Sequence, residues 1–267
     1  MIRLLALDLD GTLVRKDGSY DPRDLAAVAQ ARQRGIEVLL ATGRLIGGTA
    51  PVARDLALTA PMVCADGATI ARPDGELVHE ATIDPAMGVS IVAAMENAGL
   101  HPFVFDHHRV HATHAGEPIA FHTRAWSPDV RFYTQLVDHD VITMLLGLGE
   151  EAPVAVVRAD LEREHGDAID VLHFGFRTGT WAVRIVKRGV SKGSAVRRVA
   201  TSLGIDVSET ACVGDWFNDV PLFETVGRSF AMGGAPSEVV AKASDALSSM
   251  TGEGGGIAEA IGRIFAA

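Results

Sequence analysis

The sequence has only two cysteines, Cys64 and Cys212, and its hydrophobic runs all fall short of the about 20 residues needed to cross a membrane. Each cysteine lies in a short apolar run that is typical of a buried strand, where a thiol is usually inert. Two such residues make no disulfide framework. We therefore expect a soluble protein of a reducing compartment, the cytoplasm, with no membrane partner.

Positive charge is also scarce. The 267 residues include 24 Lys and Arg against 34 Asp and Glu, which gives a formal net charge of −10. Such a surface repels polyanions, which argues against a nucleic acid partner. The first residues show no small-residue cleavage pattern after an apolar segment, so we expect no signal peptide. Hydrophobic residues make up 48% of the chain, enough for a large globular core.

One apolar run, which begins at Leu4, ends in the acidic sequence Asp8-Leu9-Asp10-Gly11. Side chains two residues apart in a strand point the same way, so Asp8 and Asp10 leave it on one side, and Gly11 lets the chain turn. Two adjacent carboxylates repel each other unless one is protonated or a hard cation such as Mg²⁺ lies between them. The same residues are compatible with an ordinary strand and turn, so other motifs must decide.

Apolar strands alternate with helical patterns in the first and last parts of the chain. After the opening strand, the pattern predicts strands at 36–41, 61–65, 210–214 and 229–232, and helices at 20–35, 45–58, 191–203 and 257–264. This alternation predicts an α/β fold, a doubly wound, Rossmann-like parallel sheet with helices on both faces.

The rhythm changes in the middle of the chain. There the pattern predicts helices at 84–99 and 153–164, a hairpin at 101–113, and strands at 140–146, 169–174 and 181–186. All ten histidines fall between His79 and His173. We therefore expect a core domain made of residues 1–81 and 187–267, and an inserted α+β cap domain made of residues 82–186.

Polar residues follow four of the predicted core strands. They are Asp8 with Asp10, Thr42 with Gly43, Asp66, and Asp215 with Asn218 and Asp219. Ligands of open α/β sheets bind beyond the carboxyl ends of the strands, so these residues are expected to converge. A cluster of carboxylates requires a divalent cation, and oxygen ligands favour Mg²⁺ over zinc.

Phosphate binding requires hydrogen-bond donors and positive charge. Thr42 offers a hydroxyl, Gly43 an approachable amide, and Lys192 a cation near a helix start. Thr42 could instead cap a helix, and Lys192 taken alone would be interpreted as a solvated surface lysine. An aspartate can attack phosphorus to form an aspartyl-phosphate, and Asp10 could protonate the leaving oxygen and then take a proton from water.

Four motifs in order resemble those of the haloacid dehalogenase superfamily, and within it the Cof-type phosphatases, which carry a large α/β cap after the third core strand. The motifs are Asp8 to Leu13, Ala41 to Arg44, Lys187 to Gly193, and Gly214 to Asp219. Two positions depart from the family pattern. Asp66 stands where the family often has Asn, and Gly234 where it often has a second Asn.

The resemblance implies a role for each motif residue. Asp8 would be the nucleophile, Asp10 the general acid and base whose backbone carbonyl also binds metal, and Asp215 a metal ligand. Thr42, Gly43 and Lys192 would bind the phosphate, and Asn218 and Asp219 would support phosphate and metal.

Two further residues are less closely assigned. Arg44 would reach the substrate or brace the core, and Asp66 would lie at the mouth between core and cap.

The expected protein is therefore an Mg²⁺-dependent phosphatase that acts on a small phosphorylated metabolite, such as a sugar phosphate, with the cap closing over it. One alternative is a phosphomutase or phosphotransferase on the same scaffold. Another is a non-catalytic metabolite-binding protein, although the presence of all four motif residues argues against it: Asp8, Asp10, Lys192 and Asp215. The sequence indicates no oligomeric state.

Overall fold

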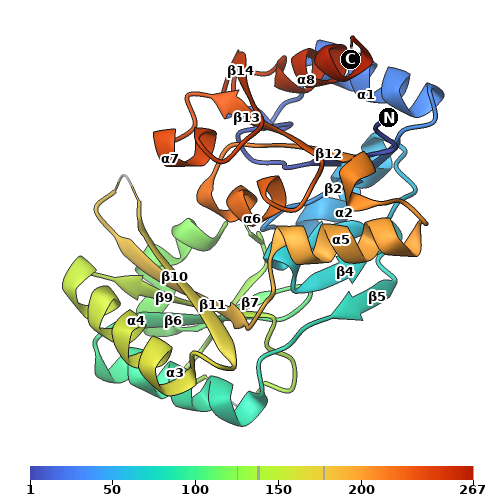
Figure 1. The fold of residues 1–267 in the computed structure, drawn as a ribbon. Helices are drawn as coiled ribbons and strands as arrows, with labels where there is room; N and C mark the ends of the chain where they lie inside the picture. The colour runs from blue at the N-terminus through green and yellow to red at the C-terminus, as the bar shows by residue number, and fades with distance from the viewer. Residues whose placement is uncertain (125, 137–138, 177, 267) are drawn as a thin grey trace. The chain divides into compact units, whose positions relative to one another are not determined.

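The computed structural model describes residues 1–124, 126–136, 139–176 and 178–266. The chain forms two compact units. The core unit comprises residues 1–43, 49–79 and 191–267, and the inserted unit comprises residues 44–48 and 80–190. Figure 1 shows the elements of both units, and each unit is described below by itself.

A five-stranded parallel sheet forms the centre of the core unit. Its strands, in spatial order, are β14 (Asp245–Met250), β13 (Arg228–Gly233), β12 (Thr210–Gly214), β1 (Leu4–Leu7) and β2 (Glu37–Leu40). From β1 the chain passes to β2 on one side, whereas β12 to β14 extend on the other. The strand order therefore reverses between β1 and β12, which is where α/β sheets place their ligands.

Helices cover both faces of this sheet, as Figure 1 shows with α1 and α8 on one side and α5 on the other. The helices of the core unit are α1 (Pro22–Gln33), α2 (Ile46–Asp55), α5 (Lys192–Ser202), α6 (Val220–Phe223), α7 (Ser237–Val240) and α8 (Gly256–Phe265). The first three residues of α2 are grouped with the inserted unit. Every residue of β1 is buried, which explains its unbroken apolar sequence. The prediction of a doubly wound parallel sheet is confirmed.

The third predicted core strand differs from expectation. Segment β3 (Met62–Cys64) joins β2 through an isolated parallel bridge between Ala41 and Val63. Its ladder partner is β4 (Thr69–Ala71), which runs antiparallel and continues to β5 (Leu77–Glu80). The positive φ angles of Ala65, Asp66 and Gly67 turn the chain back on itself directly after β3, and this tight turn replaces a crossover.

The inserted unit contains a six-stranded sheet. Its strands, in spatial order, are β10 (Ile169–Gly175), β11 (Trp181–Lys187), β9 (Met144–Gly149), β6 (His101–Phe105), β7 (Val110–Thr113) and β8 (Val130–Tyr133). The last pair is parallel and the others are antiparallel. Helices α3 (Pro85–Asn97) and α4 (Glu151–His165) pack on the sheet through a buried apolar cluster that includes Ile91, Met95 and Leu161.

The predicted hairpin at 101–113 is present as β6 and β7. Asp106 closes its turn, because Oδ1 accepts the backbone N–H groups of His108 and Arg109 at 2.6 and 2.7 Å. Oδ2 of Asp106 lies 2.8 Å from Nε2 of His111, whose Nδ1 lies 3.1 Å from the Tyr133 hydroxyl. This buried histidine therefore braces the hairpin.

Both cysteines are free and fully buried, as the sequence predicted. Burial raises the pKa of the Cys64 thiol to about 12, which keeps it protonated and unreactive at neutral pH. Among the described residues, no helix combines the length and apolarity that crossing a membrane would require.

Candidate active site

Asp8 and Asp215 lie at the carboxyl ends of two neighbouring strands. In the ladder of β1 and β12, Leu7 faces Val213, so each acid follows its strand at the same edge. The backbone N–H of Asp8 donates to the carbonyl of Val213 at 3.0 Å, which continues the pairing to the first acid. Both side chains are buried. The sheet thus brings together acids that are 207 positions apart, at the point where its strand order reverses.

Lys192, the first residue of α5, reaches into this cluster. Its Nζ lies 2.6 Å from Oδ1 of Asp8 and 2.7 Å from Oδ1 of Asp219, and its side chain is 1% exposed. Ser191 caps the helix by accepting the N–H of Ser194 at 3.1 Å, which fixes the helix start. A Cβ on Gly193 would collide with the carbonyl of Pro221, so only glycine allows α5 to pack this close to the backbone of Pro221.

Asp219 holds the acidic loop in place. Its Oδ2 accepts the backbone N–H groups of Asp215 at 2.9 Å and Trp216 at 3.1 Å, while Oδ1 accepts from Lys192. Gly214 leaves room for this carboxylate, because a Cβ there would overlap it. With these three donors in place, Asp219 orients Asp215 and Lys192 in addition to contributing its charge.

Burial raises the pKa of Asp8 well above its ordinary value. Lys192 opposes this rise, and the negative charges of Asp219 and Asp215 add to it. The pKa of Asp215 rises to about 7, again chiefly through burial and then through repulsion by Asp219. Burial alone would lower the pKa of Lys192, but Asp219, Asp8 and Asp66 together raise it, so the ammonium stays charged. One lysine therefore only partly balances the acids.

Asp8, Asp215 and Asp219 could hold a metal ion, because each offers an oxygen within 4.8 Å of the others. An all-oxygen donor set suits a hard divalent cation. Gly11, at φ +88°, leaves the space beside Asp215 open, since a Cβ there would collide with Oδ2. The Thr12 hydroxyl donates to the other oxygen, Oδ1, at 3.4 Å. The cluster therefore fits a cation that would neutralise the excess negative charge.

The predicted phosphate-binding residues flank these acids. Thr42 is buried, and its backbone N–H donates to Val63 at 2.9 Å while its carbonyl accepts the N–H of Asp66 at 3.1 Å. Gly43, partly buried, follows it. The Asn218 amide donates to Oδ1 of Asp66 at 2.8 Å. Asp66 thus links the ends of β2 and β3 to the acidic loop, a connection that sequence reasoning missed.

Two predicted residues lie outside the group of buried side chains. Asp10 is exposed, and its backbone pairs with Val14 in the turn after β1. Its negative charge nevertheless adds to the rise in the pKa of Asp215, so it lies near the acids. This exposure is compatible with the predicted exchange of protons between Asp10 and water. Arg44 belongs to the inserted unit, where its guanidinium donates to the carbonyl of Gly48 at 3.5 Å.

Thr12 is a second residue of the site that sequence reasoning missed. Its hydroxyl group, directly after Gly11, was a usable signal.

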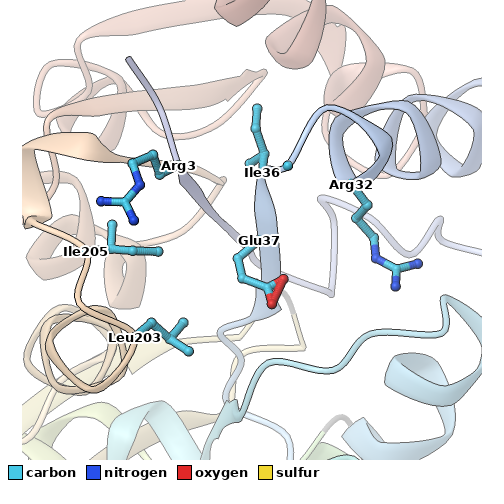
Figure 2. A pocket seen from close by; sticks show the side chains of 7 residues that line it. Arg3, Arg32, Ile36, Glu37, Leu203 and Ile205 are labelled. Carbon is cyan, nitrogen blue, oxygen red and sulfur yellow. The ribbon is translucent and has the colours of Figure 1, made fainter.

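A cavity of about 470 Å³ lies at the other end of the core sheet. Figure 2 shows the side chains of Arg3 and Arg32 on either side of Glu37. Arg3 precedes β1 and Glu37 begins β2, so this cavity is at the amino ends of the strands, away from the acids. Arg3 pairs with Glu209 at 3.0 Å and Arg32 donates to the carbonyl of Leu56 at 3.2 Å. Both guanidinium groups therefore form contacts within the core unit.

Comparison with known proteins adds independent findings. The family model of the haloacid dehalogenase-like hydrolases matches residues 5–261. The chain is 26% identical to phosphatase YwpJ of Bacillus subtilis, over 89% of this chain and 92% of that protein. It is 27% identical to the pyridoxal phosphate phosphatase YbhA of Escherichia coli, over 90% and 91% of the two chains.

A solved structure shares the fold. It is a haloacid dehalogenase-like hydrolase from Bacteroides thetaiotaomicron, with a TM-score of 0.84 and 23% sequence identity. The match covers 99% of this chain and 100% of that one.

Proposed function

Because the chain belongs to the haloacid dehalogenase-like hydrolase family and is a phosphomonoester hydrolase, we propose that it is an Mg²⁺-dependent phosphatase of small phosphorylated metabolites. The observation that carries the proposal is the ion pair between Lys192 and Asp8 inside a cluster of buried acids. The names of the two phosphatase relatives support the reaction class. A cap role for the inserted residues 82–186 is part of the proposal.

In the first step, a carboxylate oxygen of Asp8 attacks phosphorus while the bond between phosphorus and the ester oxygen breaks. Asp10 donates its proton to the leaving oxygen, so the alcohol departs neutral. Lys192 lies beside the attacking carboxylate and offers positive charge to the phosphoryl oxygens, and Thr42 offers a hydroxyl. The product of this step is an aspartyl-phosphate on Asp8.

In the second step, water attacks the phosphorus of the aspartyl-phosphate and the bond to Asp8 breaks. Asp10, now ionised, takes a proton from that water. Inorganic phosphate leaves, and both acids return to their starting states. Because Asp10 is exposed, water has access to the group that must accept its proton.

Mg²⁺, when bound, would supply positive charge that lowers the repulsion between the phosphate and the acids. Asp8 and Asp215 would hold it, with the Asp10 carbonyl as a further oxygen ligand. Asp219 would contribute mainly by fixing the N–H groups of Asp215 and Trp216.

The test is release of inorganic phosphate from a panel of sugar phosphates, nucleotides and pyridoxal phosphate, with Mg²⁺ and without an added acceptor. We expect Asp8→Asn to lose about a thousandfold or more in turnover. Asp55→Asn, the same change at an exposed position that ends α2, is the matched control and should retain activity. Retained turnover in Asp8→Asn would contradict the nucleophile assignment, and activity that survives EDTA would contradict the metal.

A further inference from the structure

Two exposed aromatic side chains share the loop that carries the acids of the site. Trp216 and Phe217 directly follow Asp215 and are 45% and 38% exposed. Their ring centroids are 5.4 Å apart with an interplanar angle of 81°, an edge-to-face contact. Single exposed apolar residues are common on proteins, but aromatic side chains beside a few polar groups are what ligand-binding sites are usually lined with.

The backbone that carries Trp216 is fixed by the acids. Its N–H donates to Oδ2 of Asp219 at 3.1 Å, and its carbonyl accepts the N–H of Asp219 at 2.9 Å. Phe217 begins the short 3-10 turn η4 (Phe217–Asp219) and contacts the indole ring with its own. Because the backbone is fixed, only the side-chain torsions of Trp216 remain to be ordered when its ring contacts a ligand.

The buried groups of the site are suited to phosphate and metal, and they offer little to the organic part of a substrate. Lys192, Asp8 and Asp215 carry charge, and Thr42 and Thr12 carry hydroxyl groups. Trp216 and Phe217 directly follow the buried Asp215, so the inference places the organic part of a bound substrate beside the loop of residues 215–218. The apolar, planar surface that this loop exposes to solvent is the aromatic pair.

We propose that Trp216, braced by Phe217, stacks against a planar ring of the substrate, so that the enzyme prefers small phosphate monoesters that carry an aromatic or heteroaromatic ring. This inference rests on the proposed function and narrows its substrate class. An offset stack between two aromatic rings is more favourable than contact between an aromatic ring and a saturated ring of the same size. The preference should therefore follow the planarity of the ring.

Benzyl phosphate and cyclohexylmethyl phosphate provide the matched test. Both are primary phosphate monoesters with a six-membered ring one carbon from the ester oxygen, and they differ in ring planarity. The measurement is the ratio of kcat/KM for the two compounds, from phosphate release in Mg²⁺, compared between wild type and variants. The two esters differ in intrinsic reactivity, but this difference is the same for every enzyme, so it cancels when the ratio of a variant is divided by that of the wild type.

We expect the wild type to favour benzyl phosphate and Trp216→Leu to lower the ratio by roughly three- to tenfold. Trp216→Phe keeps a planar ring and should retain most of the preference. Phe265→Leu is the matched control, because this phenyl ring lies on α8, where the guanidinium of Arg34 covers it at 3.9 Å from the ring centroid. That variant should leave the ratio unchanged.

Phosphate release from other members of the panel, but from neither benzyl phosphate nor cyclohexylmethyl phosphate, would overturn the inference and leave the phosphatase proposal intact. An unchanged ratio in Trp216→Leu, with both substrates slowed equally, would overturn the inference, because the pair would then serve only the loop. Equal use of both compounds by the wild type would overturn it too and leave the phosphatase proposal intact. If the wild type releases phosphate from neither compound nor from any member of the wider panel, the proposed function fails and this inference fails with it.

Discussion

Nζ of Lys192 lies 2.6 Å from Oδ1 of Asp8, and both side chains are buried, at 1% and 7% exposure. The residues are 184 positions apart, so this pair links the first strand of the core to the helix that follows the inserted unit. A buried ion pair contributes modestly when intact, but removal of one partner leaves a buried charge without compensation. The pair thus couples the stability of the core unit to the proposed catalytic chemistry of Asp8.

Lys192→Met should show this coupling. Methionine has a similar length but no charge, so Asp8 and Asp219 lose their shared cation, and we expect the free energy of unfolding at pH 7 to fall by about 3 kcal/mol. Phosphate release should fall to background. Lys16→Met is the control, because Lys16 also pairs at 2.7 Å, with Glu253, but both side chains are more than half exposed. That exposed pair should contribute little to urea-denaturation midpoints. Equal midpoints for both variants would contradict the argument.

Asp66 adopts a left-handed backbone conformation, with φ 53° and ψ 26°. Asn tolerates this region and keeps an oxygen for the Asn218 amide, whereas Ala has neither property. We expect Asp66→Ala to lower the free energy of unfolding by about 2 kcal/mol, and Asp66→Asn to change it far less. Chemical denaturation of both variants checks this. A larger loss in the Asn variant would show that the charge of Asp66 matters more than its backbone.

Metal binding should weaken in acid. A cation binds the ionised form of Asp215, and the pKa of this group rises to about 7, so protons compete with the metal below that pH. We expect the Mg²⁺ concentration that half-saturates the thermal stabilisation to rise by about tenfold between pH 8 and pH 6. Melting temperatures in a Mg²⁺ series measure this without substrate, whose phosphate also titrates. A half-saturation concentration that stays constant with pH would contradict the proposed role of Asp215.

The parts of this fold that could be predicted from the sequence are those whose apolar patterns report burial directly. The apolar runs before Asp8 and Asp215 predicted two core strands, and their acids predicted which sheet edge carries the site. The different contacts of Asp215 and Asp219 could not be predicted: it is Asp219 that accepts the backbone N–H groups of Asp215 and Trp216, and this depends on the folded loop. The left-handed turn at Asp66 depends equally on packing.

Strand β14 shows a second limit. Its sequence, Asp-Ala-Leu-Ser-Ser-Met, has one buried residue, Leu247, and no apolar run, so no strand was predicted there. The segment forms a strand because β13 supplies a parallel partner and because Glu259 of α8 binds its serines. Both interactions come from elsewhere in the chain, and a local pattern does not report them.

Glu259 therefore gives a test of how the edge of the core sheet is held. Its Oε2 accepts the backbone N–H and the hydroxyl of Ser248 at 3.0 and 2.9 Å, and both corresponding groups of Ser249 at 3.0 Å. Burial tends to raise the pKa of this carboxyl, but these hydrogen bonds outweigh it and lower the pKa to about 2. The folded state thus favours the ionised carboxylate.

Because the folded pKa lies below the unfolded value of about 4.3, this stabilisation is complete above the unfolded pKa and is lost as the pH falls toward 2. We expect Glu259→Gln to lower the free energy of unfolding by about 1 to 2 kcal/mol at pH 7, with a deficit that shrinks below pH 4. Urea denaturation at several pH values measures this. Glu224→Gln is the control, since Glu224 forms an exposed pair with Lys242 at 2.8 Å. If the Glu259→Gln deficit were the same at pH 7 and pH 3, the hydrogen bonds to the ionised carboxylate would not be its cause.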